Sequence, residues 1–142
     1  MKYFLFALSL FAVGCSFQKP VPQGFAAYTS GKITRAVHPE DIVYRVKKVS
    51  PDQEASLDYW KSAVKTRMLA SGYKLIEEGF LDKGGKQFLY SFAAPYGTET
   101  YNYWVSFYLE KENIVLTEIA GPAQTMEVHS QVLRKSILEQ NK

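Results

Sequence analysis

The side chains that could perform chemistry in this chain are few. His38 and His129 are its two imidazoles, and Cys15 is its single thiol. Imidazole nitrogens and thiolates are the usual zinc ligands, and both can act as bases or nucleophiles. His38 precedes a proline in a predicted turn, so we expect it to be a surface residue. His129 falls on the apolar stripe of a predicted helix, so we expect it to be a packing residue. Because no third ligand stands nearby at a fixed spacing, the sequence predicts no metal site and no cofactor.

Pairs of carboxylates could serve acid–base hydrolysis, as they do in glycosidases. Glu77 and Glu78 are adjacent in a predicted strand, so their side chains should point to opposite faces. Glu110 and Glu118 lie on strands joined by a predicted hairpin and could approach each other, although a solvated sheet edge is the simpler reading. The sequence holds no Gly-rich phosphate loop and no nucleophile elbow. We therefore predict a protein that is not an enzyme, with a small envelope hydrolase acting on cell-wall material as the alternative.

Aromatic side chains gather in residues 96–108. Rings with polar tips suit surfaces that stack against sugars or dock onto proteins, but cross-strand packing favours the same residue types. Alternation along the predicted strand divides these rings between two faces. The better core face holds Tyr101, Tyr103, Val105, Phe107 and Leu109. The second face holds Trp104 and Tyr108, which we predict as candidate binding residues together with Tyr96, unless the helices cover that face.

Hydrophobic periodicity gives the elements that must position these residues. Two short strands over residues 25–28 and 32–37 precede a β-branched strand over residues 42–49. A capping box follows, in which Ser50 is the expected N-cap, and a helix should begin directly after it. The apolar stripe of this helix has spacings of three and four residues, and Gly72 supplies its left-handed end. The stripe consists of Leu57, Trp60, Val64 and Met68.

The second half of the chain reads as a meander followed by a helix. Strands are predicted over residues 73–81, 86–94, 100–110 and 114–120. The connections between the first two and the last two are short enough for hairpins, so the four strands should run antiparallel. A second helix runs from Gly121-Pro122 to about Gln140. An antiparallel meander with two main helices packed on it is an α+β fold.

This order of elements resembles the PsbP-like fold over roughly residues 25–140. The resemblance is carried by Leu57-Asp58-Tyr59-Trp60 and Ser71-Gly72-Tyr73 at the first helix, and by Glu118-Ile119-Ala120-Gly121-Pro122 before the last. Small, mostly uncharacterised bacterial lipoproteins with this domain are more similar to the chain than the photosynthetic proteins that name the fold. The resemblance implies a domain that binds other proteins or helps to assemble them, since few members are enzymes. A fold alone licenses no function.

The N-terminus has the layout of a secretory signal. Lys2 is followed by an uncharged apolar run over residues 3–13. Eleven helical residues at about 1.5 Å each cannot cross a hydrocarbon core roughly 30 Å thick, so this segment is expected to be a signal and not a permanent span. The alternative is an ordinary signal peptide that leaves its single cysteine free.

The expected cleavage site resembles the lipobox of bacterial lipoproteins. Residues 10–15 read Leu-Phe-Ala-Val-Gly-Cys, with Ala12 where leucine is usual. The resemblance implies cleavage before Cys15 and acylation of its thiol, palmitate included, so that the protein is held on a membrane by lipid. An exported chain with one cysteine forms no internal disulfide, and acylation removes an otherwise exposed thiol. Ser16, in place of the aspartate that favours inner-membrane retention, points to the periplasmic face of an outer membrane if the cell has one.

The length and the charge of the chain limit the number of domains and the kind of partner. Removing residues 1–14 from the 142-residue chain leaves 128, enough for one domain. Lys2 leaves with the signal, so 16 of the 17 basic residues remain against 14 acidic ones, which argues against nucleic acid as a partner. We predict a lipidated cysteine and flexible tether over residues 15–24 and a single domain over residues 25–142. The expected role is a non-catalytic envelope module that binds a protein or a cell-wall component, or that stabilises a larger complex.

Overall fold

The computed structural model describes residues 17–51, 56–95 and 97–142 of the chain. Its centre is a seven-stranded antiparallel sheet with strand order β1-β2-β3-β7-β6-β5-β4. The strands are β1 (Ala26–Ser30), β2 (Ile33–Val37), β3 (Val43–Val49), β4 (Lys74–Phe80), β5 (Phe88–Ala93), β6 (Tyr101–Glu110) and β7 (Asn113–Pro122). The helices are α1 (Leu57–Ala70), α2 (Ala123–Val128) and α3 (Ser130–Glu139). The predicted α+β class and the meander of the last four strands are confirmed.

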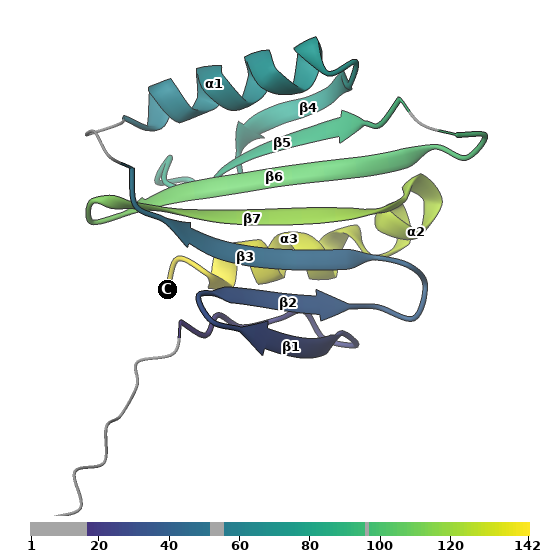
Figure 1. Ribbon diagram of the computed structural model, residues 1–142, viewed down its shortest axis with the longest axis horizontal. Coiled ribbons are helices and arrows are strands. Elements are labelled where there is room, and N and C mark those ends of the chain that lie inside the picture. The colour runs from purple at the N-terminus through teal and green to yellow at the C-terminus, as the bar shows by residue number, and fades with distance from the viewer. Residues whose placement is uncertain (1–16, 52–55, 96) are drawn as a thin grey trace, which may run out of the picture.

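The helices lie on opposite faces of the sheet. In Figure 1, α1 runs along β4, while α3 passes behind β3 and β2. Along each strand, alternate side chains belong to the α1 face and to the α3 face. The sheet is therefore the middle of three layers, and both of its faces have an apolar core.

Each face has its own set of buried side chains. On the α1 face the core consists of Phe88, Tyr90, Phe92, Val105, Phe107, Ile114 and Leu116. The predicted helix stripe, Leu57, Trp60, Val64 and Met68, packs against that set, as expected. On the other face, Met126, Leu133 and Ile137 of α2 and α3 are fully buried against the sheet. The β6 residues of this second core are Trp104 and Tyr108.

Two helix boundaries differ from the prediction. The N-cap of α1 is Ser56, whose hydroxyl accepts a hydrogen bond from the Tyr59 N–H at 3.2 Å. Ser50 is not the cap, because its hydroxyl donates to Asn113 Oδ1 at 2.6 Å at the end of β7. The predicted last helix is two helices, α2 and α3, that meet at His129. Gly72 ends α1 with φ of 86°, as the sequence predicted.

Residues 17–24, which we call the N-terminal strap, are packed onto the domain and are not a flexible tether. Phe17 and Val21 pack against the core on the α3 face. The Lys19 N–H donates to Thr34 Oγ1 at 3.2 Å, and the Pro20 carbonyl accepts from Gln140 Nε2 at 2.7 Å. The two prolines and the glycine suggested a linker, but apolar side chains between them find partners on the sheet and on α3. Cys15 lies outside the described residues.

None of the helices in the described part of the chain is long and apolar enough to span a membrane.

Candidate functional site

The two candidate binding aromatics of β6 are buried. Trp104 is 4% exposed and Tyr108 is 2% exposed, both beneath the C-terminal helices. The Arg134 guanidinium of α3 lies 5.0 Å from the centre of the Trp104 ring and helps to cover it. Of the two alternatives left open by the sequence, exposure or cover by the helices, the second holds, because the apolar stripe of α2 and α3 needs an apolar sheet face beneath it. Tyr96, the third candidate, lies outside the described residues.

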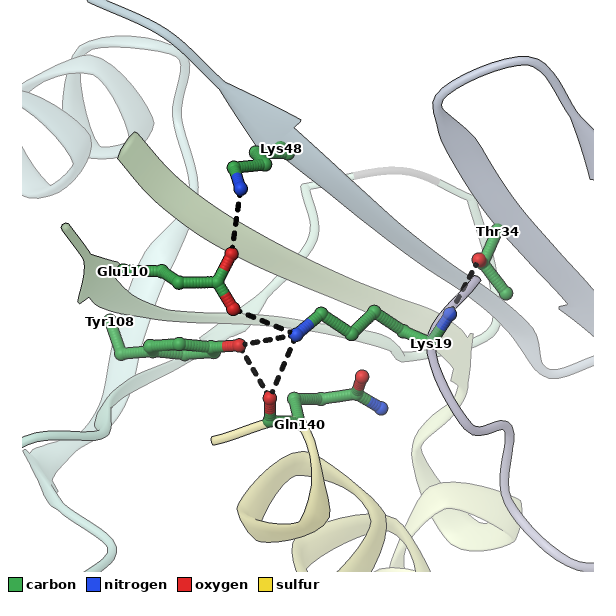
Figure 2. Close-up of polar contacts among 6 residues, drawn as sticks. All are labelled: Lys19, Thr34, Lys48, Tyr108, Glu110 and Gln140. Atoms are coloured by element: carbon green, nitrogen blue, oxygen red, sulfur yellow. Dashed lines mark hydrogen bonds and ion pairs between the residues drawn. The ribbon is translucent and has the colours of Figure 1, made fainter. Parts of the chain in front are cut away.

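Tyr108 belongs instead to a polar cluster that fastens the N-terminal strap (Figure 2). Lys19 Nζ donates to the Tyr108 hydroxyl at 3.0 Å, to Glu110 Oε1 at 3.0 Å and to the Gln140 carbonyl at 3.1 Å. The Tyr108 hydroxyl in turn donates to that same carbonyl. Lys48 of β3 donates to the other oxygen of Glu110 at 2.8 Å. The cluster thus joins the strap, two strands and the end of α3.

The charges in this cluster stabilise one another. Hydrogen bonds from Lys48 and then Lys19 hold the pKa of Glu110 below its ordinary value. Burial by itself lowers the pKa of Lys19, but the hydrogen bonds to Tyr108 and Glu110 outweigh it, and the pKa is raised. Both groups are therefore charged at neutral pH. We infer that the cluster holds the strap on the domain and is not a reaction centre.

The two acidic pairs weighed from the sequence do not converge. Glu77 is bound by Arg134 of α3 at 2.6 Å, whereas Glu78 is bound by Lys65 of α1 at 3.0 Å, so they point to opposite faces as predicted. Glu110 points to the α3 side of the sheet and contacts Lys19. Glu118 points to the α1 side, so the hairpin joining β6 and β7 does not bring these two carboxylates together.

Half of the α1 face of the sheet is left uncovered by α1. None of the described helices lies in front of β1, β2 and β3 in Figure 1. A hollow of about 230 Å³ lies here. The open sheet face, as we call it, includes Tyr28, Arg35, Val43, Arg45, Tyr103 and Glu118. Tyr28 is 53% exposed and Val43 is 52% exposed, so apolar surface is available beside the charges.

A row of opposed residues crosses the open sheet face. Tyr28 lies opposite Arg35, Arg35 opposite Arg45, and Arg45 opposite Glu118. Glu118 accepts from Arg45 Nε at 2.7 Å and from the Tyr103 hydroxyl at 2.5 Å. No ion pair joins Arg35 to another residue in the described part of the chain. Like charges directly opposite each other on a sheet repel, so the two arginines favour an additional anion beside Arg35.

The environment of Tyr103 keeps it neutral. Burial and then the neighbouring Glu118 carboxylate raise the pKa of the Tyr103 hydroxyl well above its ordinary value. The hydroxyl therefore serves as a hydrogen-bond donor that holds Glu118 in place. Together with Arg45, it fixes the orientation of the carboxylate at the edge of the hollow.

Sequence reasoning missed this surface, although a signal for it was present. In β3, the exposed or half-buried Val43, Arg45 and Lys47 alternate with buried Tyr44 and Val46. That alternation predicts a strand with one face open to solvent. The aromatic strand β6 alternates in the same way, but residues 104–108 are buried on both of its faces, whereas β3 has Arg45 and Lys47 on the open face.

The two histidines, predicted on separate elements, meet at the surface. The ring centroids of His38 and His129 are 4.5 Å apart. Glu40 lies between them, with Oε2 at 2.6 Å from His129 Nε2 and at 3.7 Å from His38 Nδ1. The predicted absence of a nearby third ligand is thus wrong, since Glu40 stands only two residues after His38. Glu40 is 59% exposed, so the cluster is at the surface and not in a deep pocket.

Comparison with known proteins defines the fold and leaves the function open. No protein-family model matches the chain, and neither does any curated protein. Solved structures do match it. The Ran-binding protein Mog1p of Saccharomyces cerevisiae is 12% identical, with 85% of each chain covered and a TM-score of 0.57.

Two further solved structures share the fold. The cyanobacterial PsbP protein, CyanoP, of Synechocystis is 12% identical over 84% of this chain and 82% of its own, with a TM-score of 0.58. A protein of unknown function from Pseudomonas aeruginosa is 8% identical over 80% of this chain and 93% of its own, with a TM-score of 0.59. The PsbP-like α+β fold expected from the sequence is therefore confirmed. At these identities the likeness extends to the fold alone.

Proposed function

We propose that this chain is a lipid-anchored protein of the bacterial cell envelope that binds a partner protein through the open sheet face and catalyses no reaction. The single observation that carries the binding role is the row from Tyr28 to Glu118. It combines exposed aromatic and apolar side chains with an arginine that has no ion-pair partner among the described residues. Tyrosine and arginine are the residue types enriched at protein interfaces.

The charges of the open sheet face select the chemistry of the partner. Arg35, Arg45 and Lys47 stand on adjacent strands of one face, and Glu118 is the carboxylate that pairs with Arg45. The surface is therefore basic, and the Arg35 guanidinium, which forms no ion pair within the described residues, can bind a carboxylate through two parallel hydrogen bonds. We infer that the partner presents an acidic residue to Arg35 and an apolar residue to Val43.

The N-terminal strap determines how the proposed lipid anchor would place the domain. If Cys15 carries the lipid, only one residue separates it from Phe17, which already packs against the domain. Such a short spacer would hold the domain next to the bilayer. The lipid and the open sheet face would then act together, because a partner in the same membrane meets the face at a raised local concentration.

A protein-binding role is compatible with this fold. By its name, the yeast protein Mog1p binds Ran, so at least one protein with this architecture binds another protein. The alternative of a small envelope hydrolase requires His129 with a carboxylate in a deep pocket. His129 does contact Glu40, but at an exposed surface that does not enclose a substrate. The binding role therefore has the stronger support.

Site-specific photocrosslinking in cells tests the proposal. A photoreactive phenylalanine analogue replaces Tyr28 on the open sheet face in the intact chain. The matched control replaces Tyr59, which is 62% exposed but lies on α1. We expect a discrete protein adduct from position 28 and none of that mass from position 59.

Reversal of the charge at Arg35 shows whether this residue is needed for partner binding. Arg35→Glu should abolish the adduct at position 28, whereas Arg67→Glu, on exposed α1, should leave it unchanged. An adduct that forms equally from both positions, or that survives Arg35→Glu, would overturn binding through the open sheet face.

A further inference from the structure

Both histidines of the chain converge on one carboxylate. His38 follows β2, and His129 stands between α2 and α3, 91 positions later in the sequence. Glu40 lies in the same turn as His38. One ligand atom from each of the three residues can be chosen so that all three atoms lie within 4.8 Å of one another. The sequence has only two histidines, and the fold brings both of them to the same carboxylate.

Two of the three separations in this cluster are close to those of a metal site, and the third lies within 4.8 Å. For a tetrahedral site with bonds of about 2.0 to 2.2 Å, neighbouring ligand atoms lie about 3.4 Å apart. The observed separations from Glu40 Oε2 are 2.6 Å to His129 Nε2 and 3.7 Å to His38 Nδ1, which lie on either side of that value. Shifts of less than 1 Å in an exposed glutamate side chain would equalise them.

Neighbouring residues hold both rings in place. The Glu40 N–H donates to His38 Nδ1 at 3.2 Å, so this nitrogen carries a lone pair and no proton. The ring of Phe25 lies 5.1 Å from the His38 ring and fixes it from the other side. The side chain of His129 caps no helix, and its Nε2 instead contacts Glu40 Oε2 at 2.6 Å. His38 is 14% exposed and His129 is 24% exposed, so water reaches the site only in part.

We propose that His38, Glu40 and His129 bind a divalent transition-metal ion, and that Zn²⁺ fits the donor set best. Two imidazole nitrogens and one carboxylate oxygen are borderline ligands, which suit zinc better than magnesium or calcium. The ion would take the lone pair that His38 Nδ1 now shares with the backbone. It would fasten the turn after β2 to the junction of α2 and α3, with a fourth position open to water.

Nuclear magnetic resonance of the histidine side chains tests this site directly. The full chain is prepared with Cys15→Ser and without a polyhistidine tag, so that no other thiol or imidazole is present. Addition of one equivalent of Zn²⁺ should move the ¹⁵N signals of both rings to metal-bound positions together. One equivalent of Mg²⁺ should leave them unchanged.

Two variants and a control assign the binding to the cluster. Glu40→Gln and His129→Ala should each weaken Zn²⁺ affinity, measured by calorimetry, on the order of tenfold or more. Glu127→Gln, at another exposed glutamate near His129, should leave the affinity unchanged. Circular dichroism checks that each variant is folded. The proposal is overturned if Zn²⁺ at one equivalent moves neither ring, or if both variants keep the wild-type affinity.

Discussion

The Lys19 ammonium donates a hydrogen bond to the Tyr108 hydroxyl at 3.0 Å, and so joins residues that are 89 positions apart in the sequence. Both side chains have further partners, which are Glu110 and the Gln140 carbonyl. This contact makes the N-terminal strap part of the folded domain. It also explains why Tyr108 is buried, since the strap and α3 close over its hydroxyl end.

Lys19→Met should release the strap while keeping most of the apolar stem of the side chain. A hydrogen bond to a charged group contributes about 1.5 to 3 kcal/mol, so we expect a loss of roughly that size in the free energy of unfolding. The smaller end applies, because Tyr108 keeps the Gln140 carbonyl and Glu110 keeps Lys48. Urea unfolding measures the loss, and amide hydrogen exchange shows faster exchange at residues 17–21.

The control for this variant is Lys32→Met, at an exposed lysine in the turn before β2. It removes the same charge and should change stability by less than about 0.5 kcal/mol. If the two variants unfold alike and the strap amides stay protected in both, the Lys19 cluster does not fasten the strap.

Cys15→Ser should leave an uncleaved precursor without lipid. The reason is that the serine hydroxyl replaces the thiol that the acyl chain is expected to modify, and cleavage follows acylation in the proteins this segment resembles. Metabolic labelling with a fatty acid and partitioning into detergent measure the result. Normal processing of the variant, with the protein still in the detergent phase, would contradict the lipoprotein prediction.

Alkaline pH should destabilise the domain in part through Tyr44. Burial raises the pKa of this hydroxyl to about 12, and the hydrogen bonds with Ser136 and Gln140 only partly offset that effect. In the unfolded chain a tyrosine has a pKa of about 10, so between about pH 10 and 12 the folded state holds more protons than the unfolded state. Stability is therefore unaffected by this group below about pH 10 and falls as the pH rises towards 12.

Comparison with Tyr44→Phe isolates the contribution of that hydroxyl. One fully retained proton corresponds to a slope of about 1.4 kcal/mol per pH unit, and the variant should lose up to that much of the slope. At neutral pH it should already be less stable by about 1 kcal/mol, because Ser136 and Gln140 lose a hydrogen-bond partner. Equal slopes in the two proteins from pH 10 to 12 would show that Tyr44 titrates alike in the folded and unfolded states.

Trp60→Ala should destabilise the domain by about 3 kcal/mol, the lower end of the range for large aromatic truncations. The lower end is expected because Trp60 packs against the core of the α1 face but is itself only partly buried. Thermal and urea unfolding measure the change. The adjacent Tyr59→Ala, which removes a ring that is 62% exposed, should cost less than about 1 kcal/mol, and equal losses would show that the helix face is misassigned.

The pattern of residues was enough to predict most of the fold. Alternation and hairpin-length connections gave the meander of β4 to β7, and spacings of three and four gave the face of α1 that contains Trp60. These signals are local, because period and turn chemistry depend on neighbours in the chain. The N-cap of α1 was misplaced because Ser50 and Ser56 both precede a region with helical character. Only tertiary contacts decide that Ser50 binds Asn113 instead.

The candidate sites depended on contacts that no local pattern contains. The sequence by itself determined the strands, the α1 stripe and the residue types that could bind or ligate. Only the tertiary structure decided that α3 covers Trp104, that no described helix covers the sheet face with half-buried Arg35, and that His129 meets His38 at Glu40. The physical reason is that alternation assigns a side chain to a face of the sheet, whereas the packing of distant helices decides which part of each face meets solvent.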